Sequence, residues 1–347
     1  MSISLTSDRQ MNIQFFTKGE GASLTQIRRG ETKLGEVIHI LDEASASSLL
    51  KAKSQGVKYL VLGIPESIGV MGNGGKPGAE NAWDSFLAAF LNVQSNRFLN
   101  GEEICVLGNI DVDFLQKKAQ ALDKEATYYT QKLHLLCEQL DELVVPVVQL
   151  IAELGFTPII IGGGHNNSFP ILMGMSKGLS TSLNALNLDA HADFRPLEGR
   201  HSGNPFSYAM QARVLEKYAV FGLHENYNNE NMLKALDSLP STRYSFLEDL
   251  VYFGKELNAS IDFVGDRKVG VELDMDALRM MPSSASSPTG FSLEQARSFA
   301  KQCAEKLDVA YLHLPEAAPI TVEQSATVGK ALTYLVTDFV KANKKGA

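Results

Sequence analysis

The alternation of short apolar runs with longer helical segments is the feature that most constrains the fold of this chain. The apolar runs span residues 58–63, 157–161, 182–188, 218–222, 268–273 and 310–314, and the clearest helical patterns span 82–91, 113–154 and 325–344. Runs that are apolar at nearly every position predict strands buried on both faces, as in a parallel sheet covered by helices. We therefore expect an α/β fold, specifically a three-layer α-β-α sandwich with a central, mostly parallel sheet.

The domain organisation is predicted from the chain length and from the segments that could separate domains. A chain of 347 residues can form one large domain or two ordinary ones. It contains no internal repeat, no low-complexity tract and no linker, so we predict a single domain over residues 1–347. Within it, the first 50 or so residues are weakly patterned, residues 283–290 form a loop by composition, and Pro146 is expected to interrupt the long helical region.

Composition excludes several classes of function. Lys and Arg total 32 against 40 Asp and Glu, a net charge of −8, which argues against binding to nucleic acid or to anionic membranes. The longest apolar stretch, 143–156, is shorter than the roughly 20 residues of a membrane span, and residues 1–16 lack the pattern of a signal peptide. Cys105, Cys137 and Cys303 lie too far apart in sequence for a CxxC metal site and read as core residues. We expect a soluble, cytoplasmic protein.

Several predicted strands end in side chains that can bind metal ions. His165 follows the strand at 157–161, and Asp189, His191 and Asp193 follow the strand at 182–188. Asp274 and Asp276 follow the strand at 268–273. The carboxyl ends of parallel strands meet at one edge of a sheet, where ligands bind. In extended backbone alternate side chains point to the same side, so each set is expected to converge.

The chemistry of this combination indicates a cation site. Four clustered carboxylates would repel one another and raise each other's pKa, and a pair of divalent cations would remove that conflict. Mixed oxygen and imidazole ligands suit manganese, with iron, nickel, cobalt or zinc as alternatives, and two such cations would activate a shared water. Asp, Asn and Gly also form ordinary turns at strand ends. Three such groups at three strand ends nevertheless favour a binuclear metal centre.

The three motifs at the strand ends are GGGH (162–165), DAHAD (189–193) and DMD (274–276). Their sequences and their order along the chain resemble those of the ureohydrolases, the family of arginase, agmatinase and formimidoylglutamase. The resemblance extends from about residue 59 onward. It implies an arginase-like fold, a homo-oligomer and two Mn²⁺ ions per chain. The implied ligands are His165, Asp189, Asp193 and Asp274 for one ion, and Asp189, His191, Asp274 and Asp276 for the other.

The resemblance also implies three catalytic roles. Asp193 would orient the nucleophile as well as bind metal, and Glu316 would neutralise the cationic group of the substrate. His201 would carry a proton to the leaving amine. Two simpler readings remain open, because His201 could merely cap a loop and Glu316 could be a surface residue at a strand end.

The segment after the DAHAD motif looks most like that of formimidoylglutamase, which hydrolyses N-formimidoyl-L-glutamate to L-glutamate and formamide. Arg195, Arg200, Ser202 and Asn204 are the substrate-binding residues expected on this basis. Arginine pairs well with carboxylates, and the substrate carries two of them, although either arginine could instead belong to a surface ion pair. The alternatives are a urea-releasing agmatinase, arginase or guanidino-acid hydrolase, and a non-catalytic family member with a binding or structural role.

Some positions depart from the family pattern. Glu272 stands where a serine is common in the family. Gly164 and Asn166 replace the aspartate and serine of the usual GGDHS. After the DMD motif, Arg279 lies in a segment where many members have the sequence xxDP. His39, His134, His224 and His313 lie in no motif and are expected to be structural. These departures surround the predicted ligands without removing any of them, so we expect the metal site to persist and any difference from other members to affect the substrate pocket.

Overall fold

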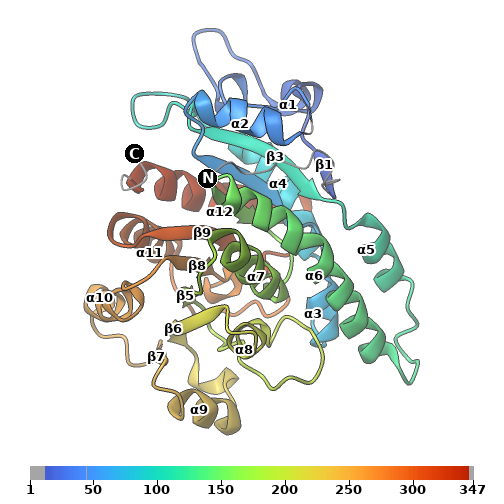
Figure 1. Ribbon diagram of the computed structural model, residues 1–347, viewed down its shortest axis with the longest axis vertical. Helices are drawn as coiled ribbons and strands as arrows, with labels where there is room; N and C mark the ends of the chain where they lie inside the picture. Colours follow the sequence, from blue (N-terminus) through green and yellow to red (C-terminus); the bar gives the residue numbers. More distant parts are fainter. Residues whose placement is uncertain (1–11, 44, 344–347) are drawn as a thin grey trace.

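A nine-stranded sheet runs through the part of the chain that the computed structural model describes, residues 12–43 and 45–343. The strand order is β1-β3-β2-β4-β9-β8-β5-β6-β7, and the labelled strands β3, β9, β8, β5, β6 and β7 follow it downward in Figure 1. Among the strands of this sheet, only β1 pairs antiparallel with its neighbour. The strands are β1 (Ile13–Phe15), β2 (Tyr59–Gly63), β3 (Ile104–Ile110), β4 (Thr157–Ile161), β5 (Leu183–Leu188), β6 (Leu215–Leu223), β7 (Thr242–Phe246), β8 (Val269–Leu273) and β9 (Val309–Leu314).

Helices cover both faces of this sheet. They are α1 (Lys18–Leu24), α2 (Ala46–Ser54), α3 (Ile68–Gly72), α4 (Ala82–Phe90), α5 (Asp113–Gln120), α6 (Tyr129–Glu153), α7 (Ser168–Leu179), α8 (Pro205–Gln211), α9 (Glu230–Asp237), α10 (Phe253–Val264), α11 (Leu293–Lys306) and α12 (Val322–Ala342). One core packs α4, α10, α11 and α12 against the sheet, and the other packs α5 to α9 against the opposite face. The predicted three-layer α/β fold is therefore confirmed.

The six strands predicted from apolar runs are all present, and three further strands were not predicted. β3 was missed because Gly108 and Asn109 interrupt its apolar pattern. β1 has only three residues and lies at the edge of the sheet, while the opposite edge strand, β7, is only half buried along its length. Edge strands bury little surface, so their sequences carry a weak apolar signal.

The predicted break at Pro146 is wrong. Pro146 lies within α6, a continuous helix of 25 residues, and the long helical region is instead divided between α5 and α6. Proline removes one hydrogen bond, but the buried side of α6 packs against α7 and the sheet along most of its length. That burial outweighs the lost hydrogen bond. After β2, no helix was predicted before residue 82, and the structure adds the short helix α3 there.

The weakly patterned N-terminal region does contain regular structure, and one local signal could have located it. Thr17 and Glu20 form a capping box at the start of α1, with the Thr17 N–H donating to the Glu20 carboxylate at 2.7 Å. A Thr-x-x-Glu sequence is a known helix-start signature. The three cysteines are buried and unpaired, as expected. The described residues include no helix that is both long enough and apolar enough to span a membrane.

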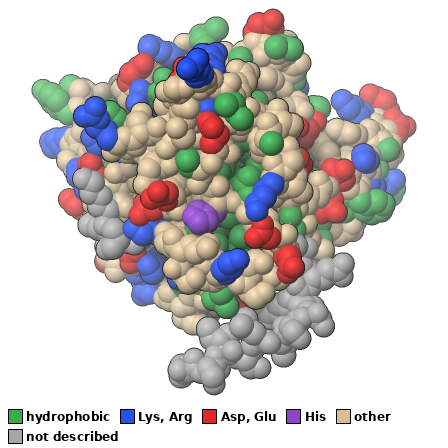
Figure 2. Space-filling view, turned by 90° about the horizontal axis from the view of Figure 1, so that it is seen from above, with side chains coloured by type: hydrophobic (Ala, Val, Ile, Leu, Met, Phe, Trp, Pro, Cys, Tyr) green, Lys and Arg blue, Asp and Glu red, His purple; other side chains and the backbone are tan. Residues whose placement is uncertain are grey.

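Charged side chains of both signs are distributed over the surface. On the face shown in Figure 2, acidic and basic side chains alternate and no basic patch gathers.

Candidate metal centre

The residues of the candidate site follow the carboxyl ends of four adjacent strands of the sheet. In spatial order these strands are β4, β9, β8 and β5, and each is followed at its carboxyl end by at least one of the predicted residues. His165 follows β4, Glu316 follows β9, Asp274 follows β8 and Asp189 follows β5. The carboxyl edge of the sheet therefore gathers residues that lie up to about 150 positions apart in sequence, as the general rule for open α/β sheets predicts.

The first donor group surrounds the buried imidazole of His165. Its Nδ1 lies 2.9 Å from Asp193 Oδ2, 2.9 Å from Asp274 Oδ2 and 3.2 Å from Asp189 Oδ2. One ligand atom from each of these four residues lies within 4.8 Å of the others. These are the four residues that the resemblance assigns to one metal ion.

The second donor group contains Asp189, His191 and Asp276, whose ligand atoms also lie within 4.8 Å of one another. His191 Nδ1 is 3.3 Å from Asp276 Oδ2, and the imidazole is partly exposed. Asp189 belongs to both groups and is the residue that joins them. Asp274, which the resemblance assigns to both metals, lies in the first group only.

The expected reason for this convergence, alternation along extended strands, is wrong. β5 ends at Leu188 and β8 at Leu273, so both motifs lie in turns beyond their strands. Asp189 Oδ1 accepts from the His191 N–H at 2.7 Å, and Asp274 Oδ1 accepts from the Asp276 N–H at 2.7 Å. Short polar side chains commonly close turns in this way. In each turn, one carboxylate oxygen shapes the backbone and the other points toward His165.

The cluster fits a cation. Both ring nitrogens of His165 and Oδ1 of Asp276 are buried without a hydrogen-bond partner among the described residues. Burial and the neighbouring carboxylates Asp276 and Asp189 raise the pKa of Asp274 well above its ordinary value. Burial and Asp189 likewise raise the pKa of Asp193 to about 6. Carboxylates that oppose one another's ionisation around an unpartnered imidazole are expected where divalent cations bind.

Glu316 lies beside the first donor group. It follows β9 in a left-handed conformation, with φ of 66°, and is nearly fully buried. Its Oε1 accepts from the His165 N–H at 2.8 Å. Burial first, and then Asp276 and Asp193, raise the pKa of Glu316 to about 8, so a cationic group bound next to it would favour its ionised form.

The departures at Gly164 and Asn166 compensate for each other. A Cβ added at Gly164 would lie 2.4 Å from Asn166 Oδ1, so the asparagine side chain fills the space in which a residue at 164 would place its own. The preceding glycines, Gly162 and Gly163, have φ of 81° and 73°, which glycine adopts without strain. This explains how the turn accommodates GGGHN in place of the commoner family sequence.

Two residues behind the cluster were not identified as functional from the sequence. Glu272 was noted only as a departure from the family, and His313 was read as structural. Both are fully buried, their side chains are 2.7 Å apart, and Glu272 Oε2 lies 3.6 Å from His165 Nε2. Burial opposes ionisation of Glu272, but His313 and His165 outweigh it and lower its pKa to about 2.

Arg200 occupies a different place from the one expected of a substrate residue. Its side chain is 2% exposed, and Nε donates to Asp141 Oδ2 at 2.8 Å. The rest of the guanidinium donates to Asp141 Oδ1, to the Asn166 carbonyl and to Asn204 Oδ1. Buried and bonded on this many sides, Arg200 ties the loop of residues 195–204 to α6 and to the turn after β4.

Asn204 and Ser202 also act within this loop. The amide of Asn204 is fully buried and donates to the Gly199 carbonyl at 2.8 Å, while its Oδ1 also accepts from the His201 N–H. Ser202 contacts the turn after α3, where its Oγ accepts from Asn73 Nδ2 at 3.4 Å. Neither contact reaches the two donor groups, so the structure shows both residues holding the loop together.

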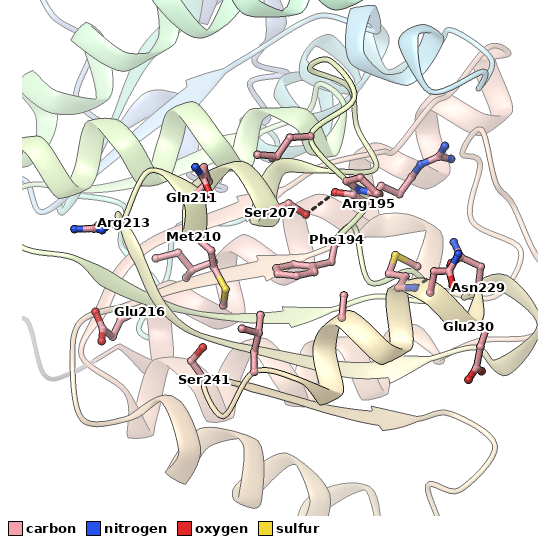
Figure 3. A pocket seen from close by; sticks show the side chains of 17 residues that line it. Phe194, Arg195, Ser207, Met210, Gln211, Arg213, Glu216, Asn229, Glu230 and Ser241 are labelled. Atoms are coloured by element: carbon pink, nitrogen blue, oxygen red, sulfur yellow. Dashed lines mark hydrogen bonds between the residues drawn. The ribbon is translucent and has the colours of Figure 1, made fainter.

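Arg195 is the exposed arginine of the loop. Its side chain is 47% exposed, and Nε and one terminal nitrogen each lie 2.8 Å from Glu198 Oε1. It lines the rim of a groove of about 1120 Å³ beside α8 and α9, with Phe194 and Met210 on the apolar floor (Figure 3). In this view Arg195 and Arg213 lie toward opposite ends of the groove. None of the six predicted metal ligands lines this groove, although its lining residue Phe194 follows Asp193 directly in sequence.

His201 is buried within the loop. Its Nδ1 accepts from the Gly203 N–H at 3.1 Å, and its ring lies 5.3 Å from that of His134. No hydrogen bond, ion pair or ring contact among the described residues links His201 to a member of either donor group. The geometry gives His201 a part in shaping the loop and offers no contact that supports a proton-shuttle role.

Comparisons with known proteins agree with this geometry. The arginase family model matches residues 57–339. Formimidoylglutamase of Streptococcus pyogenes serotype M3 is 27% identical over 259 residues, which cover 70% of this chain and 70% of that protein. The solved formimidoylglutamase of Bacillus subtilis has a TM-score of 0.71 at 18% identity, covering 92% of this chain and 94% of that one. Trypanosoma cruzi formiminoglutamase with Mn²⁺ has a TM-score of 0.69 at 18% identity, covering 90% and 98%.

Proposed function

Because the chain belongs to the arginase family and is a hydrolase of carbon–nitrogen bonds in linear amidines, we propose that it hydrolyses N-formimidoyl-L-glutamate to L-glutamate and formamide. The observation that carries this proposal is the pair of donor groups joined by Asp189 at the carboxyl edge of the sheet. The formimidoylglutamase relative and the exposed Arg195 favour this substrate over other linear amidines.

Two Mn²⁺ ions are the cofactors that suit these groups. His165, Asp189, Asp193 and Asp274 would hold one ion, and Asp189, His191 and Asp276, with Asp274 as the residue implied by the family, would hold the other. When bound, the two cations would lower the pKa of a water molecule and so supply the nucleophile at neutral pH. The T. cruzi formiminoglutamase was solved with Mn²⁺, which supports this choice of metal.

The protein's own residues would bind and orient the amidine. Glu316 uses Oε1 to accept from the His165 N–H, which leaves Oε2 to accept from the cationic formimidoyl nitrogen. Because the pKa of the Glu316 carboxyl group is raised, the binding of a cationic substrate group beside it would favour its ionised form. Asp193, beside His165 Nδ1 and next in sequence to the groove residue Phe194, would orient the nucleophile toward the substrate.

Arg195 would recognise a carboxylate of the glutamate moiety. Its guanidinium is half exposed and, among the residues that the structure describes, pairs only with Glu198 and weakly with Asn73, so a substrate carboxylate can replace the Glu198 contact. Exposed ion pairs of this kind are worth only about 0–1 kcal/mol, so the exchange costs little.

The test is a panel of substrates on Mn²⁺-loaded protein, with formamide and urea measured separately. Formamide release from N-formimidoyl-L-glutamate supports the proposal, and urea release from arginine, agmatine or a guanidino acid without formamide release overturns the choice of substrate. Arg195→Ala should lower kcat/KM for the dicarboxylate by about 10-fold or more, in line with a charge-assisted hydrogen bond. An unchanged kcat/KM would favour an amine substrate that lacks the distal carboxylates.

A non-catalytic role is the remaining alternative. A family member that had lost its activity would be expected to have lost metal ligands, yet all six ligand positions keep their expected residue types. Elemental analysis that finds no metal bound to protein prepared in the presence of Mn²⁺ would favour this alternative.

A further inference from the structure

The imidazole of His165 faces acidic groups on both of its nitrogens. Nδ1 faces the three aspartates of the first donor group, while Nε2 points to the opposite side of the ring, where Glu272 Oε2 lies at 3.6 Å. That separation is about 0.4 Å beyond hydrogen-bond range. Nε2 is buried and has no hydrogen-bond partner among the described residues. Glu272 is the acidic group that the structure places on this side of the ring.

Glu272 itself is held firmly. Its Oε2 lies 2.7 Å from His313 Nδ1, and its Oε1 accepts from the Tyr311 hydroxyl at 2.6 Å. All three side chains are fully buried. Ser168, the first residue of α7, adds a contact of 3.3 Å between its Oγ and His313 Nδ1. The carboxylate is therefore fixed in place by groups other than His165.

The sheet register explains this arrangement. Glu272 on β8 and His313 on β9 are direct cross-strand partners, and Tyr311 lies two residues before His313 on the same face of the sheet. On the other side of β8, Asn187 of β5 is also in register with Glu272. Asn187 Nδ2 donates to Asp189 Oδ2 at 2.9 Å. A buried polar row, defined here as Asn187, Glu272 and His313, thus crosses three strands directly behind the metal-binding residues.

A histidine that binds a metal through one nitrogen must carry its proton on the other. Such histidines usually donate that proton to a carboxylate, a carbonyl or a water, which fixes the ring orientation and makes the nitrogen ligand more basic. We propose that Glu272, held by His313 and Tyr311, accepts a hydrogen bond from the Nε2–H of His165 and is the positioning residue that fixes this imidazole on the metal. The inference rests on the binuclear centre of the proposed function.

The test measures Mn²⁺ binding rather than turnover. Glu272→Gln keeps the size of the side chain and removes its charge, and the control Asn184→Ala removes a fully buried, hydrogen-bonded amide at the opposite end of β5. The readout is the free Mn²⁺ signal in electron paramagnetic resonance as MnCl₂ is added to metal-free protein. We expect Glu272→Gln to weaken one of the two sites by roughly 10–100-fold, and Asn184→Ala to bind like the wild type.

The outcomes separate this inference from the proposed function. If Glu272→Gln binds Mn²⁺ at two sites with wild-type affinity, the inference is overturned and the proposed function is unaffected. The same holds if Asn184→Ala weakens Mn²⁺ binding as much as Glu272→Gln does. Wild-type protein that binds no Mn²⁺ overturns the proposed function and, with it, the inference. If Glu272→Gln does not fold, Tyr311→Phe removes only the hydroxyl that holds Glu272. It should weaken the same site by a smaller factor, and unchanged binding overturns the inference.

Discussion

The ligand cluster, part of which follows β5, and the loop of residues 195–204, which comes next along the chain, differ in how their buried charged side chains are paired. In the cluster, three aspartate oxygens surround His165 Nδ1, which has no hydrogen-bond partner in the described part of the chain. In the loop, Arg200 is equally buried, but Asp141, Asn204 and a backbone carbonyl occupy its donors. Buried groups that the protein satisfies stabilise the fold, and buried groups that it leaves unsatisfied mark where a ligand belongs.

The largest expected effect comes from the cluster. Asp274→Asn keeps the oxygen that accepts from the Asp276 N–H but removes a charge beside His165, so Mn²⁺-dependent hydrolysis should fall about a thousandfold or more. The same change should raise the melting temperature of metal-free protein, because it removes one of several mutually repelling carboxylates. Steady-state rates and calorimetry check the two halves. Full activity, or a metal-free variant that melts lower, would contradict the assignment of Asp274 to the cluster.

In the loop of residues 195–204, by contrast, removing a charge should lower the stability of the metal-free protein. Arg200→Met leaves Asp141 buried without its partner, and breaking a buried ion pair in this way costs about 3–5 kcal/mol of unfolding free energy. Urea unfolding of metal-free protein measures this loss. The matched double variant, Arg200→Met with Asp141→Leu, should recover most of it, because no charge is then left unpaired. If the Arg200→Met variant is instead nearly as stable as the wild type and has a strongly raised KM, Arg200 is a substrate-binding residue.

The smallest expected effect is a pH dependence within the loop. Burial first, and then His134 and Arg195, lower the pKa of His201 to about 4, against an ordinary value of about 6.5. Between those values the unfolded chain binds a proton that the folded chain does not, so stability falls as the pH is lowered from 6.5 toward 4.

Comparison of urea unfolding at pH 7.5 and pH 5 tests this dependence. At pH 5, His201 should account for at most about 2 kcal/mol of the loss, at about 1.4 kcal/mol per pH unit. His201→Gln should lose correspondingly less stability than the wild type between the two pH values. An equal loss in both proteins would show that His201 is not held in its neutral form by the loop.

The residues of the two donor groups could be predicted because they lie next to local signals. Each lies no more than five residues beyond the end of an apolar strand, and the parallel fold brings strand ends to one edge. The supporting residues could not be predicted in this way. Glu272 stood out only as a departure, and His313 had no motif around it, since their pairing depends on the register between β8 and β9. In the same way, nothing near Arg200 indicated that its partner would be Asp141, 59 residues away.

The sequence by itself determined the fold class, the residues at the strand ends and the chemistry that those residues can support. It did so because strand periodicity, turn formation and ligand type are local properties of a chain. Only the tertiary structure decided that β4, β9, β8 and β5 lie side by side, that two turns rather than strand alternation aim the aspartates, and that Arg200 serves the fold. Those outcomes depend on which distant groups become buried together, and burial decides whether a charge is paired within the protein or left for a ligand.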